Sequence, residues 1–167
     1  MSMSLSAESE IRQLLARSSD CVWRKDLEQY GLCWSTNGEW RILGSVARGR
    51  EAIKMAWWRL MDPLRSAWQI SHNVVLEIEE QHARGRLFVE ETLVLADGTV
   101  NLSRGIYHDT YVIEDGLWRF GTRHFDLIYM GPPDLTGRFF ATVPYGPAPT
   151  DPDPSRPATP SFQEVFG

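Results

Sequence analysis

Apolar residues recur at helical spacing through the first third of the chain. After Ser6, a stripe of apolar and small side chains falls every three or four residues, which predicts a helix with one buried face: Ile11, Leu14, Leu15, Ser18 and Val22. A second, short helix is expected after Asp26, whose side chain can cap it. A third is expected over residues 50–61, where Asp62-Pro63 ends it. The pattern therefore predicts three N-terminal helices, with a short strand over 39–43 before the third.

From there to about residue 130, apolar and polar positions alternate, which is typical of strands. Four strands are expected, over 67–79, 86–96, 99–113 and 117–129. Asp-Gly at 97–98 and again at 115–116 predicts two-residue hairpin turns, in which both residues adopt positive φ. Strands joined in this way pair antiparallel. Helices followed by such a meander favour an α+β fold in which a curled antiparallel sheet packs on the three helices.

The last hairpin carries large side chains on both faces. If the strands alternate strictly, Tyr107 and Arg123 face the helices. The opposite face then bears four apolar side chains: Ile106, Val112, Trp118 and Phe120. So much exposed apolar area is unusual on a monomer, and the sequence therefore predicts a homodimer or homotrimer that forms through the sheet.

Proline divides the chain into two parts. Most of the ten prolines follow residue 131, and proline is excluded from the interior of helices and sheets. We therefore expect an α+β domain over 1–136 and a Pro-rich C-terminal arm over 137–167. The net charge of −5, with basic residues scattered among acidic ones, disfavours nucleic acid as a partner.

Several other classes of protein are not indicated. No apolar run reaches the length of a membrane span, and the first ten residues lack the basic and apolar regions of a secretory signal, so a cytoplasmic location is expected. No His, Cys, Asp and Glu residues have metal-ligand spacing, and no Gly-rich phosphate loop is present. The sequence therefore predicts neither a metal nor a cofactor.

A family resemblance rests on several short motifs that occur in order. Gly-x-Tyr-x-Asp-x-Tyr at 105–111, Asp-Gly-x-Trp-Arg-Phe at 115–120 and then Arg123 are similar to the closing hairpin of SnoaL-like proteins, which belong to the nuclear-transport-factor-2-like superfamily. Gly38-Glu39-Trp40, Gly-Arg-Glu-Ala-Ile at 49–53 and Asn73 fit the same order. The resemblance implies a cone, in which the curled sheet and the helices enclose a pocket. The superfamily includes dehydratases, dehydrochlorinases and non-catalytic members, so the fold alone does not fix a function.

The dehydratases and dehydrochlorinases that the chain resembles use a His–Asp pair. The aspartate, near the end of the first helix, orients a histidine on the first long strand, and the histidine removes a proton. In this chain the aspartate position is Trp23, and the histidine position, four residues before Asn73, is Gln69. Both members of the pair are therefore replaced, and a different base is needed if the pocket is catalytic.

Glu90 is the preferred candidate for that base. Glu90 and Glu91 interrupt an apolar strand, so one of them must face inward. Counting from Asn73 through the hairpin without gaps places Glu90 in the pocket, where burial would raise its pKa and suit it to proton transfer. The alternative is that Glu90 forms a structural ion pair with Arg123 or Arg104. Asp20 and His72 are the other possible bases, although the strand parity of His72 directs it away from the pocket unless a bulge intervenes.

The other candidate residues follow from the resemblance. Tyr107 and Arg123 match pocket positions and could stabilise developing negative charge, or, as the alternative, Tyr107 could belong to the core and Arg123 could pair with Asp109 or Glu90. Five further residues are expected to bind substrate: Trp23, Trp40, Gln69, Thr92 and Ser103.

Two classes of function remain open. The first is a cofactor-independent lyase or isomerase that acts by proton abstraction and elimination on an apolar, aromatic small molecule, as a dehydratase, dehydrohalogenase or deformylating lyase would. The second is a non-catalytic protein, either a scaffold like the small β-subunit of ring-hydroxylating dioxygenases or a small-molecule binding module.

Overall fold

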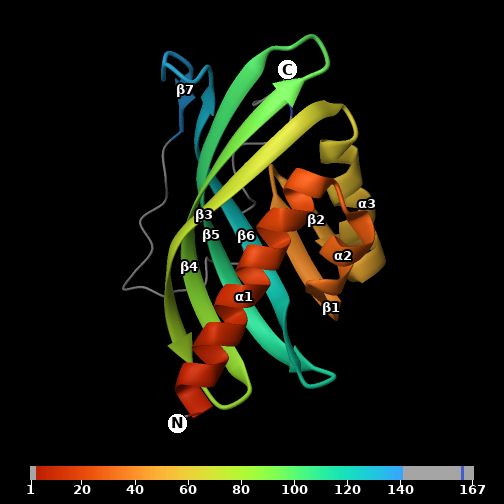
Figure 1. The fold of residues 1–167 in the computed structure, drawn as a ribbon, viewed down its shortest axis with the longest axis vertical. Helices are drawn as coiled ribbons and strands as arrows, with labels where there is room; N and C mark the ends of the chain where they lie inside the picture. The colour runs from red at the N-terminus through yellow and green to blue at the C-terminus, as the bar shows by residue number, and fades with distance from the viewer. Residues whose placement is uncertain (1–2, 141–162, 164–167) are drawn as a thin grey trace.

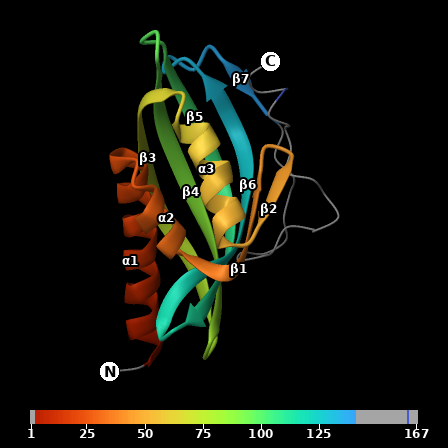
Figure 2. The same cartoon turned by 90° about the vertical axis from the view of Figure 1, so that its right-hand side faces the viewer.

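Helices on one side of a strongly curled sheet form the molecule (Figures 1 and 2). The computed structural model describes residues 3–140 and residue 163. Its helices are α1 (Met3–Arg24), α2 (Leu27–Leu32) and α3 (Arg50–Met61). Its strands are β1 (Trp34–Ile42), β2 (Ser45–Arg48), β3 (Leu64–Ile78), β4 (His82–Leu95), β5 (Val100–Glu114), β6 (Leu117–Gly131) and β7 (Arg138–Phe139).

The strands of the described residues form one sheet in the order β2-β1-β6-β5-β4-β3, with β7 paired to β6. The four long strands are antiparallel to one another, as the hairpin signals predicted. One pair, β1 and β6, is parallel. The expected α+β cone, with three helices ahead of a curled sheet, is confirmed.

Apolar stripes hold the helices against the concave face of the sheet. The predicted stripe of α1 is buried, with Ile11 and Ser18 almost fully enclosed, and the helix packs mainly on β3. Helix α1 begins at Met3 rather than after Ser6, whose hydroxyl instead donates a hydrogen bond to Glu10 at 2.8 Å. Asp26 caps α2 as expected, because its side chain accepts a hydrogen bond from the amide of Gln29 at 3.1 Å.

Aromatic side chains fill the space between α2, α3 and β1. Tyr30 stacks on Trp57, with ring centroids 4.4 Å apart, and lies 6.3 Å from both Trp34 and Trp40. Trp34 begins β1, where it is fully buried against Phe120. Offset and edge contacts of this kind stabilise a core beyond the area that they bury. This cluster forms one wall of the cavity described below.

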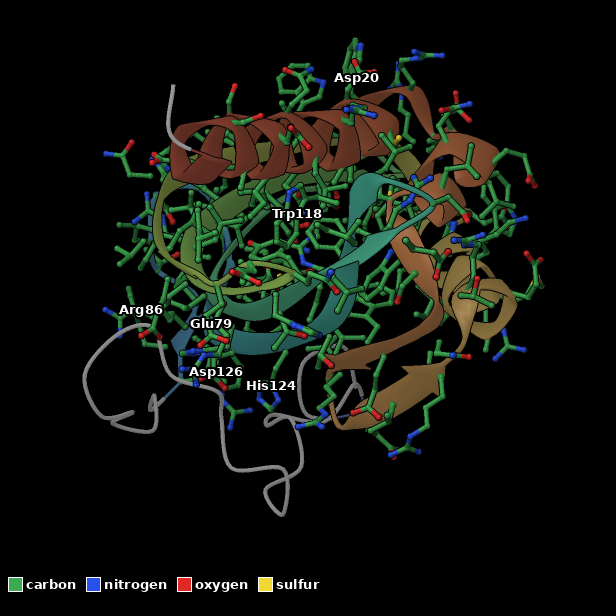
Figure 3. All side chains as sticks on the ribbon, turned by 90° about the horizontal axis from the view of Figure 1, so that it is seen from below. Asp20, Glu79, Arg86, Trp118, His124 and Asp126 are labelled. Atoms are coloured by element: carbon green, nitrogen blue, oxygen red, sulfur yellow. The ribbon has the colours of Figure 1, made fainter. Side chains whose placement is uncertain are left out.

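Two bulges in β6 change which side chains face the helices. The pairing of β5 with β6 skips Gly121 and again Ile128, so the side-chain parity of β6 reverses at each point. As a result Trp118 and Phe120 point inward together with Arg123, and Figure 3 shows Trp118 between α1 and the sheet. The expectation that Trp118 and Phe120 lie on the outer face is therefore wrong.

The C-terminal arm lies mostly outside the described residues. Of its residues, 137–140 and 163 are described, and Phe139 of β7 pairs with Tyr129 of β6. The division at residue 136 and the character of the arm stay predictions. Within the described part, no helix is both long enough and apolar enough to cross a membrane.

Candidate active site

A cavity of about 440 Å³ lies between the concave face of the sheet and the helices. Its wall combines aromatic and aliphatic side chains from all three helices and five strands, including Tyr30, Trp40, Trp57, Leu93, Phe125 and Leu127. Polar groups are few, and Arg59 and Asp97 are exposed, which places them at the mouth. A largely apolar pocket with a few convergent polar groups is typical of a small-molecule site.

Three polar side chains form a row across the wall. Gln69, Glu91 and Ser103 lie directly opposite one another on β3, β4 and β5, so all three point toward the cavity. The amide Nε2 of Gln69 donates a hydrogen bond to Oε1 of Glu91 at 2.7 Å. The amide oxygen of Gln69 accepts from the hydroxyl of Ser19 at 3.3 Å, and Ser19 in turn contacts Ser71 at 2.9 Å. Helix α1 therefore fixes Gln69, and Gln69 fixes the carboxylate.

The environment of Glu91 suits proton transfer. Burial raises the pKa of its carboxyl above the ordinary value, while the Gln69 amide, the Ser103 hydroxyl and the charge of Arg123 oppose that rise. The net shift is upward, because loss of hydration disfavours the charged form. A carboxylate that has lost water and gained few partners is a stronger base than one in solvent.

Glu90 lies on the other face of β4. It pairs with Arg104 at 2.6 Å, and neither residue lines the cavity. The expectation that Glu90 faces the pocket is therefore wrong. Strand β3 carries a bulge between Ser71 and Val74, and Asn73, from which the count started, lies within it. The bulge shifts the count by one residue and so exchanges the two faces of β4.

Tyr107 lines the cavity, and Arg123 lies directly behind it. The guanidinium of Arg123 stacks on the ring of Tyr107, 3.8 Å from its centroid, and its Nε donates to Asp109 at 2.9 Å. Burial alone would lower the pKa of Arg123, but the Asp109 carboxylate raises it, so the guanidinium stays charged. Burial also raises the pKa of Tyr107 well above the ordinary value, although the nearby Arg123 opposes this. Tyr107 is therefore a neutral phenol, able to donate a hydrogen bond.

Gly105 creates room for the aromatic floor of the cavity. It lies between Ser103 and Tyr107 on the inward face of β5, and a side chain there would place its Cβ 2.3 Å from the ring of Phe125. The ring of Phe125 therefore rests directly on the backbone of β5 and packs 4.9 Å from Tyr107. This close contact positions both rings.

The remaining candidates lie outside the cavity wall. Thr92 shares the outer face of β4 with Glu90. Trp23 is more than half exposed and packs on Trp68, and Asp20 points away from the sheet (Figure 3) and pairs with Arg24. His72 is exposed at the β3 bulge, where its ring contacts Phe88.

Of the predicted site residues, the structure brings Trp40, Gln69, Ser103 and Tyr107 into one cavity, with Arg123 behind them. Sequence reasoning missed Glu91 and Tyr30. Tyr30 is the aromatic residue of α2 and lies three residues after Leu27, so helical spacing could have identified it as a buried position near the pocket. The sequence could not decide whether Glu90 or Glu91 faces the cavity, because both faces of β4 carry apolar residues.

Comparisons with known proteins agree with this architecture. The model of the SnoaL-like domain matches residues 3–124. The chain belongs to the SnoaL-like family. No characterised protein matches the sequence significantly in a comparison with curated proteins.

Solved structures show the same fold. A type 2 hexachlorocyclohexane dehydrochlorinase superposes with a TM-score of 0.71 at 23% identity, covering 83% of this chain and 95% of that one. A candidate scytalone dehydratase from Novosphingobium aromaticivorans gives 0.72 at 18% identity, covering 89% and 97%. A protein of unknown function from Mycobacterium tuberculosis gives 0.68 at 26% identity, covering 74% and 73%. These likenesses establish the fold of this SnoaL-like protein.

The described residues contain no group of three His, Cys, Asp or Glu side chains arranged to hold a metal ion. The wall of this SnoaL-like cavity carries a carboxylate with a raised pKa and a neutral phenol, and a buried guanidinium lies directly behind the phenol. That set can accept a proton and stabilise negative charge on a bound molecule.

Proposed function

We propose that this protein is a cofactor-independent lyase or isomerase that acts on an apolar, aromatic small molecule by proton abstraction. Glu91 serves as the base, and Tyr107, with Arg123 behind it, stabilises the negative charge that develops on the substrate. Trp40, Gln69 and Ser103 shape the site. The cytoplasmic location expected from the sequence belongs to the same proposal.

The observation that carries the proposal is the position of Glu91. It is the acidic side chain placed in the middle of the cavity wall, beside Gln69 and Ser103, and the other acidic residue that lines the cavity, Asp97, lies in an exposed turn. Retaining a carboxylate in an apolar cavity opposes stability, since it must be desolvated. Buried ionisable groups that lower stability in this way are common at functional sites, where the reaction needs a group with a shifted pKa.

The reaction follows from these groups. The Glu91 carboxylate removes a proton from a carbon next to an activating group, and the electrons of the broken C–H bond form a double bond. In an elimination, the bond to a hydroxyl or halide on the adjacent carbon breaks, and the leaving group takes the electron pair. In an isomerisation, the proton returns from Glu91 to another carbon. The names of the dehydrochlorinase and the candidate dehydratase among the similar structures support the elimination.

The size and lining of the cavity support an aromatic substrate. A volume of about 440 Å³ holds a one- or two-ring molecule. Five aromatic side chains line the cavity: Tyr30, Trp40, Trp57, Tyr107 and Phe125. To find the substrate, the purified protein is incubated with small-molecule extracts, and mass spectrometry follows the loss of water, hydrogen halide or formaldehyde.

The decisive variants are Glu91→Gln and Glu90→Gln. Loss of a general base typically lowers the rate about 10²–10⁴-fold, so Glu91→Gln should lose turnover and still bind substrate. Glu90→Gln makes the same change one residue away, on the outer face, and should keep nearly full activity. Equal activities of the two variants would contradict the role of Glu91. Tight binding without turnover by the wild type would instead favour the binding-module alternative.

A further inference from the structure

Two tyrosine hydroxyls face the cavity without an acceptor of their own. Tyr30 on α2 and Tyr107 on β5 are each only 3% exposed, and both line the cavity. Neither hydroxyl donates a hydrogen bond to any residue in 3–140 or to residue 163. Buried hydroxyl groups normally form hydrogen bonds. Two phenols that donate none, in the wall of one cavity, are therefore available to donate hydrogen bonds to a bound ligand.

Each phenol has an indole N–H near its oxygen. The indole of Trp34 approaches Tyr30 and that of Trp40 approaches Tyr107, and each contact favours negative charge on the tyrosine oxygen. These contacts fall outside full hydrogen-bond geometry, since both indole nitrogens are buried without a partner. An N–H directed at a phenol oxygen leaves the phenol proton free to point elsewhere. Because both tyrosines line the cavity, a ligand bound there can accept these protons.

The two phenols also share an electrostatic environment. The pKa of Tyr30 is raised first by burial and then by its proximity to Tyr107. The pKa of Tyr107 is also raised by burial, and the charge of Arg123 opposes the rise in both tyrosines. Tyr30 packs edge-on to Trp40, which links the two phenols through one wall. A partly negative oxygen placed between the two O–H groups would therefore also feel the field of Arg123.

We infer that Tyr30 and Tyr107 form a binding subsite for a substrate oxygen, such as that of a phenol or an aryl ketone. The inference rests on the proposed function and narrows its substrate class to oxygen-bearing aromatic compounds. An oxygen-free halogenated hydrocarbon would leave both phenols unpaired, which carries a penalty in a buried site. Developing negative charge on the same oxygen would strengthen both hydrogen bonds as Glu91 removes the proton.

The test is binding of two matched ligands, 2-naphthol and naphthalene, at pH 7, followed by quenching of tryptophan fluorescence. The wild type should bind 2-naphthol more tightly. Tyr30→Phe and Tyr107→Phe should each weaken binding of 2-naphthol about three- to tenfold, the usual range for one lost hydrogen bond. Both variants should leave naphthalene binding nearly unchanged, because they keep the ring. Tyr129→Phe is the matched control, since Tyr129 bonds to Pro132 outside the cavity wall.

Three results would overturn the subsite: no detectable binding of either ligand, equal affinity of the wild type for both, or equal weakening of both ligands by the phenylalanine variants. None of these depends on turnover. If the wild type discriminates as expected but no reaction is ever found, the subsite stands and the proposed catalysis fails. If Glu91→Gln abolishes a measured reaction while the phenylalanine variants still discriminate fully, the catalysis stands and the subsite fails.

Discussion

At the scale of single residues, the pKa of Glu91 depends on one amide. Burial raises that pKa, and the hydrogen bond from Gln69 is the largest opposing effect. Gln69→Met removes the donor and should raise the pKa of Glu91 further, because the lost hydrogen bond stabilises the ionised carboxylate more than the neutral acid. The midpoint can be measured by ¹³C NMR of the Glu91 carboxyl. Activity should rise with pH through this midpoint, because only the ionised form is a base.

The corresponding control is Gln29→Met on α2, where the side chain is exposed and does not line the cavity. It should leave the Glu91 titration unchanged. A Glu91 midpoint that is equal in the wild type and in Gln69→Met would show that the amide does not act on the carboxylate.

The buried pair of Arg123 and Asp109 predicts a large effect on stability. Asp109 accepts hydrogen bonds from Arg123 at 2.9 Å and from the hydroxyl of Tyr111 at 3.0 Å, and all three side chains are buried. Asp109→Ala leaves the guanidinium charged and unpaired, which typically costs about 3–5 kcal/mol. Urea unfolding should show this as a much lower midpoint.

Removing the carboxylate from an exposed ion pair provides the comparison. Glu8→Ala breaks the contact of Glu8 with Arg12 on the surface of α1, where both side chains are about half exposed. Exposed pairs contribute little, so its midpoint should stay close to that of the wild type. Similar losses in the two variants would mean that Arg123 finds another partner after the change.

At the scale of elements, the packing of β5 against β6 depends on Gly105. Because a Cβ at this position would lie 2.3 Å from the ring of Phe125, Gly105→Ala must displace that ring or the strand. Overpacking of this kind costs about 1–3 kcal/mol, and the thermal midpoint should fall accordingly. Phe125→Leu should relieve part of the clash, so the double variant should lose less than the sum of the single losses. Additive losses would show that the ring is not the obstacle.

The two Asp-Gly turns show how far local sequence decides an element. Asp115-Gly116 forms the predicted two-residue turn, with positive φ at both positions and Glu114 opposite Leu117. Asp97-Gly98 lies in a three-residue turn that includes Ala96, and only Gly98 has positive φ. Both turn types accept the same dipeptide. The sequence therefore predicted both hairpins and only one of the two registers.

At the scale of the whole molecule, the outer face of the sheet still predicts self-association. Trp118 and Phe120 are inside, but Trp68, Ile70 and Phe88 lie exposed on β3 and β4. Exposed apolar side chains gathered on neighbouring strands are typical of an interface. We expect light scattering at micromolar concentration to give the mass of a dimer or trimer. Replacing Trp68 and Phe88 by Ser should yield monomers with an intact fold by circular dichroism, and a monomeric wild type would contradict the prediction.

The sequence by itself determined the order of the helices and long strands and placed four residues that line the cavity: Trp40, Gln69, Ser103 and Tyr107. Helical spacing through Ile11 and Val22, Asp26 as a cap and the Asp-Gly turns are local signals, so they need no knowledge of the rest of the chain. The same is true of the inward parity of Tyr107 and Ser103, since no extra residue interrupts β5 between them.

Only the tertiary structure decided which carboxylate enters the cavity and where Trp118 and Phe120 lie. Each of these depends on an added residue elsewhere: the β3 bulge after Ser71 for the carboxylate, and the β6 bulge at Gly121 for Trp118 and Phe120. Side chains on a strand alternate with a period of two, so one added residue exchanges the faces of everything beyond it. Whether a strand gains such a residue is set by how the sheet must curl to cover the helices, and that requirement is a property of the assembled molecule.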